Sequence, residues 1–139
     1  MKVSVVIPTY KRGELIRRAI ESVIKQTYNE LEIIIVSDGK YEETDNIVNE
    51  YKKLDSRIHY ISYDHSRGAN YARNAGIKYS TGNFVAFLDD DDEWVENKVE
   101  YQLKIFSEDS DIGLVYTGTQ SIYEDDQLSY NTMPSEGGD

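Results

Sequence analysis

Apolar residues along this 139-residue chain follow two spacings, which alternate from the first residues to about position 118. Short apolar runs rich in β-branched residues are typical of buried strands, whereas apolar residues recurring every three or four positions indicate one face of a helix. The predicted strands are 2–8, 31–39, 57–63, 83–89 and 112–118. The predicted helices are 14–26, 44–54, 69–79 and a fourth that contains Val95, Val99, Leu103 and Phe106.

This alternation of strands and helices indicates βαβ units. It predicts an α/β fold with a mostly parallel, Rossmann-like sheet and helices on both faces. Right-handed crossovers place the carboxyl ends of the strands at one edge, where sheets of this kind bind ligands. We therefore expect four loops to meet there, with the sequences PTYKR (8–12), SDGK (37–40), DHSRGAN (64–70) and DDDDEW (89–94).

Composition narrows the classes of function. The net charge of −11 argues against a nucleic-acid partner, because nucleic-acid phosphates repel an acidic surface. The chain has no cysteine, which excludes disulfides and thiolate metal sites. No apolar run approaches the roughly 18 residues that span a bilayer, and no signal-peptide pattern is present. We therefore expect a cytoplasmic protein that touches the inner face of a membrane only through regions outside this chain. A homo-oligomer is left open.

The run of four aspartates, Asp89 to Asp92, directly follows an apolar strand and is the strongest chemical signal. Because strand side chains alternate, Asp89 and Asp91 can face the same way, and a cation between them would offset their repulsion. Hard oxygen ligands suit Mg²⁺ or Mn²⁺, with water or substrate phosphate completing the shell. The alternative is a solvated acidic loop that favours the N-terminus of the next helix. A calcium loop is disfavoured because Trp94 stands where that loop needs glycine.

Each of the other three loops holds a candidate with a structural alternative. Tyr10 could stack on a base that Thr9 hydrogen-bonds, or the loop could be a structural turn. Asp38 could accept a hydrogen bond from a base N–H, or bond to its own turn. Arg73 could reach a diphosphate or a base edge through its fork of donors, or pair with one of the aspartates. The first loop has neither the dinucleotide-binding nor the P-loop glycine pattern.

Assembled, these residues resemble the nucleotide-binding half of a family 2 glycosyltransferase with the GT-A fold. The motifs that carry the resemblance are VSVVIPTYKR (3–12), EIIIVSDGKYEET (32–44) and GANYARNAGIKYSTGNFVAFLDDDDEW (68–94). They occur in the order and spacing of the family. We expect residues 1–118 to form the nucleotide-sugar-binding domain. Residues 119–139, which include acidic but no basic residues, would be an acidic tail or the start of a missing acceptor-binding half.

The resemblance implies that the nucleotide sugar is bound by Pro8, Thr9, Tyr10, Asp38, Arg73, Asp89 and Asp90. The segment 8–10 would line the base pocket, Asp38 would bind uracil or another base, and Arg73 would touch the nucleotide. Within the DxD motif, one of the first two carboxylates would contact the ribose, and Asp91 would hold Mn²⁺ or Mg²⁺. Lys40 replaces a small residue of the family pattern and could alter the pocket.

The implied activity is inverting, metal-dependent transfer of a sugar from a nucleotide sugar, with UDP as the expected nucleotide. The acceptor would be a hydroxyl of a saccharide, lipid or protein, as in polysaccharide biosynthesis. The acidic general base of the family has no match after residue 118, so we expect it outside this chain. The alternative is a non-catalytic nucleotide-sugar-binding module or a fragment without the base.

Two other classes are disfavoured by the first loop. A nucleotidyltransferase would need a glycine- and arginine-rich loop there, and PTYKRG offers too little of either. A receiver-type signalling domain would need an acidic pair after its first strand, where this chain has Pro8, Thr9 and Tyr10.

Overall fold

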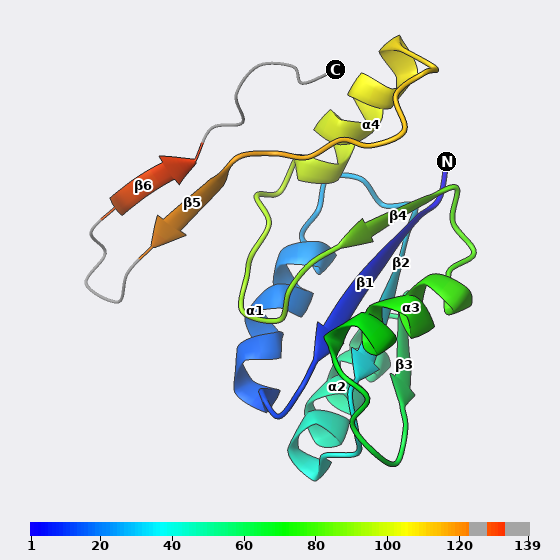
Figure 1. Cartoon of the computed structure of the whole chain (residues 1–139), viewed down its shortest axis with the longest axis vertical. Helices are drawn as coiled ribbons and strands as arrows, with labels where there is room; N and C mark the ends of the chain where they lie inside the picture. The colour runs from blue at the N-terminus through cyan, green and yellow to red at the C-terminus, as the bar shows by residue number, and fades with distance from the viewer. Residues whose placement is uncertain (123–127, 133–139) are drawn as a thin grey trace. The chain divides into compact units, whose positions relative to one another are not determined.

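In the computed structural model, which describes residues 1–122 and 128–132, the strands β1 (Val3–Thr9) and β2 (Leu31–Ser37) are buried over their whole length. Their Val- and Ile-rich sequences suit a strand covered on both faces. With β3 (Ile58–Ser62) and β4 (Phe84–Phe87) they form a parallel sheet in the order β3-β2-β1-β4 (Figure 1). The register joins Val3 to Leu31 and Thr9 to Ser37, so both central strands end at the same edge.

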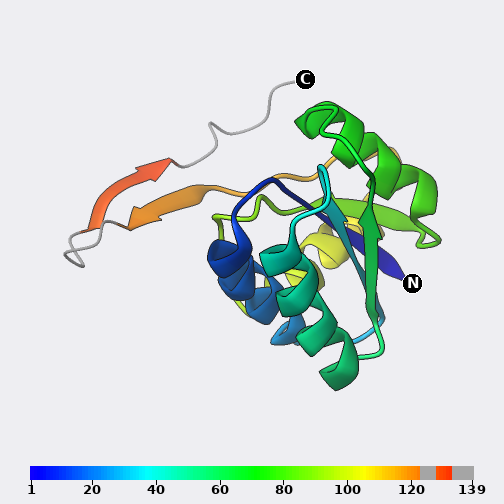
Figure 2. The same ribbon diagram turned by 90° about the horizontal axis from the view of Figure 1, so that it is seen from below.

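Helices cover the two faces of this sheet. The helices α1 (Gly13–Ile24) and α2 (Glu42–Leu54) lie on one face and α3 (Ala69–Tyr79) lies on the other (Figure 2). Right-handed crossovers explain the arrangement, because α1 and α2 join strands in one direction across the sheet and α3 returns in the other. The predicted α/β fold, with a parallel sheet between two helical layers, is confirmed. The buried apolar residues of α1 are Ile16, Ala19, Ile20 and Val23.

The position of β4 determines where ligands can bind. From β1 the chain proceeds to β2 and β3 on one side, and it later returns to place β4 on the other side of β1. The order therefore reverses between β1 and β4, and such a switch point opens a crevice at the carboxyl ends of the strands. The loop PTYKR follows β1 and the four aspartates follow β4, so the sequence places both at this crevice.

A close approach between α3 and β1 fixes the wall of that crevice. A Cβ added to Gly76 would lie 2.3 Å from Cγ1 of Val6, which is too close for any other residue without a shift of the helix. One turn earlier, Ala72 is buried against Val6, Ile34 and Val36. Two small residues on one face of α3 thus let its backbone lie close to the sheet and bring its first turn to the ligand edge.

The chain forms two compact units, Met1–Glu100 and Tyr101–Asp139, and the sequence of α4 (Lys98–Glu108) includes the boundary between them. The predicted strand at 112–118 is wrong, because those residues belong to no strand and Leu114 is 79% exposed. The strands of the second unit are instead β5 (Thr119–Ile122) and β6 (Leu128–Thr132), an antiparallel pair.

These two strands lie within the segment expected to be an acidic tail. Its parts at 123–127 and 133–139 lie outside the described residues. Within residues 1–122 and 128–132, no helix has the length and apolar character needed to cross a membrane.

Candidate functional site

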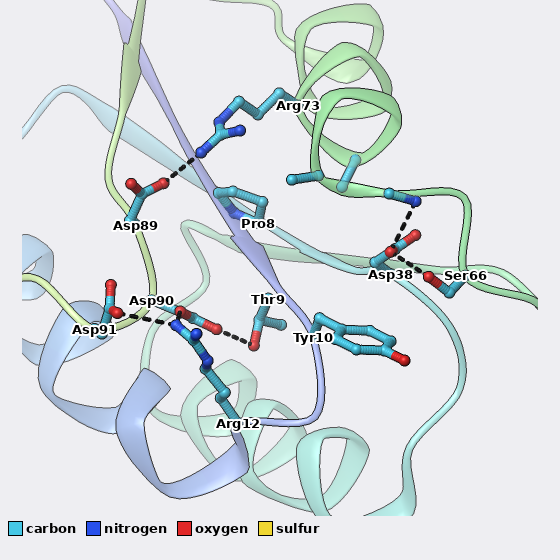
Figure 3. A pocket seen from close by; sticks show the side chains of 13 residues that line it. Pro8, Thr9, Tyr10, Arg12, Asp38, Ser66, Arg73, Asp89, Asp90 and Asp91 are labelled. Atoms are coloured by element: carbon cyan, nitrogen blue, oxygen red, sulfur yellow. Dashed lines mark hydrogen bonds and ion pairs between the residues drawn. The ribbon is translucent and has the colours of Figure 1, made fainter.

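A cavity of about 500 Å³ opens at the carboxyl ends of β1, β2 and β4 (Figure 3). It collects residues from four segments that are far apart in the sequence. The residues that line it are Pro8, Thr9, Tyr10, Arg12, Asp38, Ser66, Gly68, Ala69, Ala72, Arg73, Asp89, Asp90 and Asp91. Every site residue predicted from the sequence is therefore brought to one cavity. All four predicted loops contribute to it, together with the first turns of α3.

The end of β1 supplies one wall. The hydroxyl of Thr9 is buried and donates a 2.8 Å hydrogen bond to Oδ2 of Asp90. The Tyr10 ring is half exposed and stands edge-on to Tyr41, with ring centroids 5.6 Å apart. Lys11 has a positive φ of 52°, so the chain turns sharply before α1 begins. In this wall the Thr9 hydroxyl is the polar part and the Tyr10 ring is the aromatic part.

Asp38 is only 4% exposed, and both of its carboxylate oxygens are fully used. Its Oδ1 accepts hydrogen bonds from the Tyr63 hydroxyl (2.7 Å) and the Arg67 amide (2.7 Å). Its Oδ2 accepts from the Ser66 hydroxyl (2.6 Å) and the Gly68 amide (3.0 Å). A carboxylate offers about four acceptor positions, so the set is complete. The alternative that Asp38 bonds only to its own turn is wrong, since its partners lie 25 to 30 residues away.

This set of donors also determines the charge state of the group. Burial by itself would raise the pKa of Asp38, but the hydrogen bonds from the Arg67 amide, Ser66, Tyr63 and the Gly68 amide outweigh it, so the pKa lies below its ordinary value. The same contacts fix the segment before α3, where Gly68 has a φ of 92° that other residues rarely adopt. Asp38 therefore holds a loop in place while it borders the cavity.

Among the four aspartates only Asp90 is buried, and the other three are exposed. Asp90 is 5% exposed and turned towards Thr9, whereas the side chains of Asp89 and Asp91 are about half exposed. Asp89 accepts a 2.7 Å bond from Nη2 of Arg73. The prediction that Arg73 pairs with one of these aspartates is thus confirmed. For Asp92, burial and then the charges of Asp91 and Asp89 raise the pKa.

Arg12 is the charged residue of the cavity lining that the sequence analysis did not single out. Its Nη1 lies 3.1 Å from Oδ1 of Asp90 and 2.9 Å from Oδ2 of Asp91. These two carboxylates, that of Asp90 first, raise the pKa of Arg12. Its position two residues after Tyr10 in the same loop was the available signal. Lys40, by contrast, pairs with Asp64 at 2.8 Å and is not among the lining residues.

The acidic segment is attached to the rest of the first unit at both of its ends. At the strand end, the Leu88 amide donates to the Val6 carbonyl at 3.1 Å. At the helix end, the buried amide of Gln26 donates to the Val95 carbonyl (2.7 Å) and accepts from the Val99 amide (3.1 Å). The segment 89–94 is therefore held between two fixed points.

The carboxylates that line the cavity suit a metal site completed by a ligand better than one formed by protein side chains alone. Among the described residues, no group of three or more Asp, Glu, His or Cys side chains is placed to hold a metal ion alone. Asp89 and Asp91 do reach the cavity, where a ligand could add further oxygen atoms. Mg²⁺ and similar ions commonly bind through one or two carboxylates together with substrate phosphates. The donor set fits an ion that arrives with a phosphorylated ligand.

Comparison with known proteins agrees with this geometry. The family model for glycosyl transferase family 2 matches residues 4–136. The putative teichuronic acid biosynthesis glycosyltransferase TuaG of Bacillus subtilis is 37% identical over 123 residues, which are 88% of this chain and 48% of that protein. The glucosyltransferase WfgD of Escherichia coli, which acts with UDP-Glc according to its name, is 40% identical over 103 residues, 74% of this chain and 40% of that protein.

A solved structure shows the same fold. Residues 1–349 of TarS from S. aureus superpose with a TM-score of 0.72 and 28% identity, over 78% of this chain and 33% of that one. The chain spans less than half the length of each of these relatives. The GT-A architecture expected from the sequence is confirmed by these neighbours. The match of the family model over most of the chain shows that this protein belongs to glycosyl transferase family 2.

Proposed function

We propose that this chain binds a nucleoside diphosphate sugar and forms the donor-binding part of a metal-dependent, inverting glycosyltransferase. The observation that carries the proposal is that one cavity has two chemically different sides (Figure 3). One side has the exposed ring of Tyr10 and the buried carboxylate of Asp38. The other has Asp89 and Asp91 beside two guanidinium groups. The first side suits a nucleobase and the second suits a diphosphate with its cation.

On the base side, Tyr10 offers a ring face that its contact with Tyr41 restrains. Stacking of a base on an aromatic side chain contributes about 1–3 kcal/mol. Asp38 would accept the base N–H, and because its acceptor positions are full, that N–H would replace a present donor. The Ser66 hydroxyl is the donor that lines the cavity and can rotate. The UDP-Glc in the name of WfgD favours a uracil base.

On the diphosphate side, Asp91 would hold Mn²⁺ or Mg²⁺. Asp89 would contact the ribose in preference to Asp90, because Asp90 is turned inwards onto Thr9 and Arg12. Arg73 lies beside Asp89 and would touch the nucleotide. When bound, the metal ion supplies positive charge that stabilises the departing diphosphate.

In the proposed transfer, an acceptor hydroxyl oxygen bonds to the anomeric carbon from the side opposite the diphosphate. The bond from that carbon to the diphosphate oxygen breaks, and the hydroxyl proton passes to a general base. The residues of this chain hold the donor and its leaving group in position. We place the base and the acceptor site in the part of the relatives that this chain does not span.

The relatives favour particular acceptors. The name of WfgD includes a sugar linked to diphosphoundecaprenol, and that of TuaG includes teichuronic acid biosynthesis. Both support a saccharide acceptor in polysaccharide biosynthesis, on a lipid carrier in the first case. The cytoplasmic location remains a prediction from the sequence, and a homo-oligomer stays open.

Binding without transfer is the second candidate, favoured by the partial span of the relatives. Release of UDP from UDP-sugars, measured with and without Mn²⁺ and acceptor, separates the two. Mn²⁺-dependent release of UDP by this chain would support an active donor site of a glycosyltransferase. Tight binding with no release would support a donor-binding module.

The decisive test is calorimetric titration of UDP in the presence and absence of Mn²⁺. We expect metal-dependent binding that Asp91→Ala weakens by about 100-fold, because the substitution removes the ligand of the ion that bridges to the diphosphate. Glu93→Gln is the matched control, since it removes a negative charge from the same loop at a residue outside the cavity. Equal, metal-independent affinity of Asp91→Ala and the unchanged chain would contradict the proposal.

A further inference from the structure

Arg12 lies between two carboxylates of the acidic segment and contacts Asp91, the residue proposed to hold the divalent ion. A single nitrogen, Nη1, contacts both Asp90 and Asp91, at 3.1 and 2.9 Å. The two carboxylates differ in freedom. Asp90 is buried and its second oxygen is held by Thr9, whereas the Asp91 side chain is 51% exposed. The contact of Arg12 with Asp91 is therefore the half that can open at low cost.

We propose that Arg12 is a built-in counter-ion that is exchanged during donor binding. It neutralises Asp91 in the free protein, leaves that carboxylate to the divalent ion, and turns its guanidinium group onto the diphosphate. This inference rests on the proposed function, because it assumes a diphosphate and a metal ion in this cavity.

The charge of the acidic segment explains why such a residue is needed. Four adjacent carboxylates repel one another when all of them are charged. In the free protein, Arg12 and Arg73 each neutralise part of this charge from the cavity side. Without Arg12, Asp90 would be a buried carboxylate that keeps the Thr9 hydroxyl as its hydrogen-bond donor. Such a charge is costly, and a metal ion would offset the cost.

The position of Arg12 also suits its second role. The side chain is half exposed and lines the cavity together with Arg73. A guanidinium group presents several donors in a plane that match phosphate oxygens. Arg12 is the residue directly before α1, and its Nη1 can stay in contact with Asp90. A rotation of the guanidinium group is then enough to exchange Asp91 for a phosphate oxygen.

Exchange of this kind couples two binding events. The ion alone must displace Arg12 without a new partner for the guanidinium group, so it binds weakly. When the diphosphate is present, the released guanidinium gains a phosphate partner, and each ligand strengthens the binding of the other. Phosphate oxygens that ligate the ion already couple metal and nucleotide binding, and the exchange of Arg12 adds to that coupling.

The test compares Arg12→Gln with Arg18→Gln in the full chain. Arg18 is the matched control, because it loses the same charge and pairs with Glu93 of the same loop outside the cavity. Mn²⁺ binding alone is followed by the loss of the electron paramagnetic resonance signal of the free ion, and UDP binding at saturating Mn²⁺ is followed by calorimetry. We expect Arg12→Gln to bind Mn²⁺ alone roughly 5-fold more tightly and UDP about 10-fold more weakly. Arg18→Gln should match the unchanged chain in both.

Arg12→Lys separates charge from geometry and serves if Arg12→Gln does not fold. It keeps the positive charge but lacks the planar fork, so its affinity for Mn²⁺ alone should stay within about 2-fold and UDP should bind about 5-fold more weakly. Unchanged affinity of Arg12→Gln for Mn²⁺ alone, or for UDP, overturns the exchange. If the unchanged chain itself fails to bind UDP with Mn²⁺, the proposed function fails instead.

Discussion

Strand β2 carries a buried carboxylate at each end, and the two ends of the sheet use it differently. Glu32 lies at the amino end and Asp38 directly follows the carboxyl end, and each is less than 5% exposed. Glu32 contacts the ammonium group of Lys2 at 2.6 Å, the Ser4 hydroxyl, and both the amide and the hydroxyl of Thr81. It joins β1, β2 and the connection that leads into β4, and it closes that end of the sheet.

Asp38 has the same number of donors but no cation among them. Its partners are two hydroxyl groups and two backbone amides, all from residues 63–68. Those residues border the cavity, so the carboxylate arranges a loop for a ligand and does not close a strand end. Burial and a full set of hydrogen bonds therefore do not by themselves indicate that a carboxylate has a function. The segment that supplies its partners does.

The largest expected effect comes from Asp38→Asn, which tests the cavity end of the comparison. The new amide group would face hydrogen-bond donors where an oxygen now accepts two bonds, and the segment before α3 would lose its anchor. We expect a loss of about 2–3 kcal/mol in the free energy of unfolding, and a loss of UDP affinity of at least about 10-fold. Urea unfolding and calorimetry measure the two quantities. Normal UDP binding by the folded variant would show that the two ends do not differ in function.

Glu32→Gln makes the same change at the opposite end. Burial would raise the pKa of Glu32, but its bonds to Lys2, Ser4 and Thr81 lower it from 4.5 to about 2. The stabilisation is complete above pH 4.5 and is lost as the pH falls towards 2, because in that range the unfolded chain binds a proton that the folded chain does not. A shift of this size corresponds to roughly 3 kcal/mol.

We therefore expect Glu32→Gln to be about 3 kcal/mol less stable than the unchanged chain at pH 7 in urea unfolding, and the difference to shrink between pH 4.5 and 2. UDP affinity at pH 7 should stay within about 2-fold, since Glu32 lies at the far end of the strand from the cavity. A stability difference that is constant with pH would contradict the assigned role of Glu32.

Lys40→Ala should give the smallest effect. Lys40 follows the same turn as Asp38, but its ammonium group pairs with the exposed Asp64 and does not line the cavity. Exposed ion pairs contribute little to stability, so the melting temperature should not change and the UDP affinity should stay within about 2-fold. A marked change in affinity would show that Lys40 alters the pocket after all, as its departure from the family pattern suggests.

The elements of the first unit follow from the sequence because burial imposes the spacing of apolar residues. The helix 69–79 has its predicted bounds, and β1 begins and ends one residue later than expected. The strand expected at 112–118 is absent, so a short apolar run does not by itself specify a strand. The strand β5 (Thr119–Ile122) begins directly after these residues and pairs with β6, whose sequence has no strong apolar pattern.

The site was predictable to the level of the loops that meet, since parallel strands bring their carboxyl ends together. The pairing of side chains was not. That Asp90 turns inwards, that Arg12 contacts two carboxylates, and that Asp38 is saturated all depend on rotamers and on the path of residues 63–68. Spacing along the chain carries no information about these choices.

Gln26 restrains the acidic segment in a way that affects how this part of the chain can vary. With Leu88 tied to Val6 at one end and Val95 and Val99 tied to Gln26 at the other, the stretch between them spans a set distance with a set number of residues. The fixed ends could not accommodate an inserted or deleted residue in this stretch. Such a change would displace the carboxylates from their contacts with Thr9 and Arg12. Substitution is open to this stretch, but a change in its length is not.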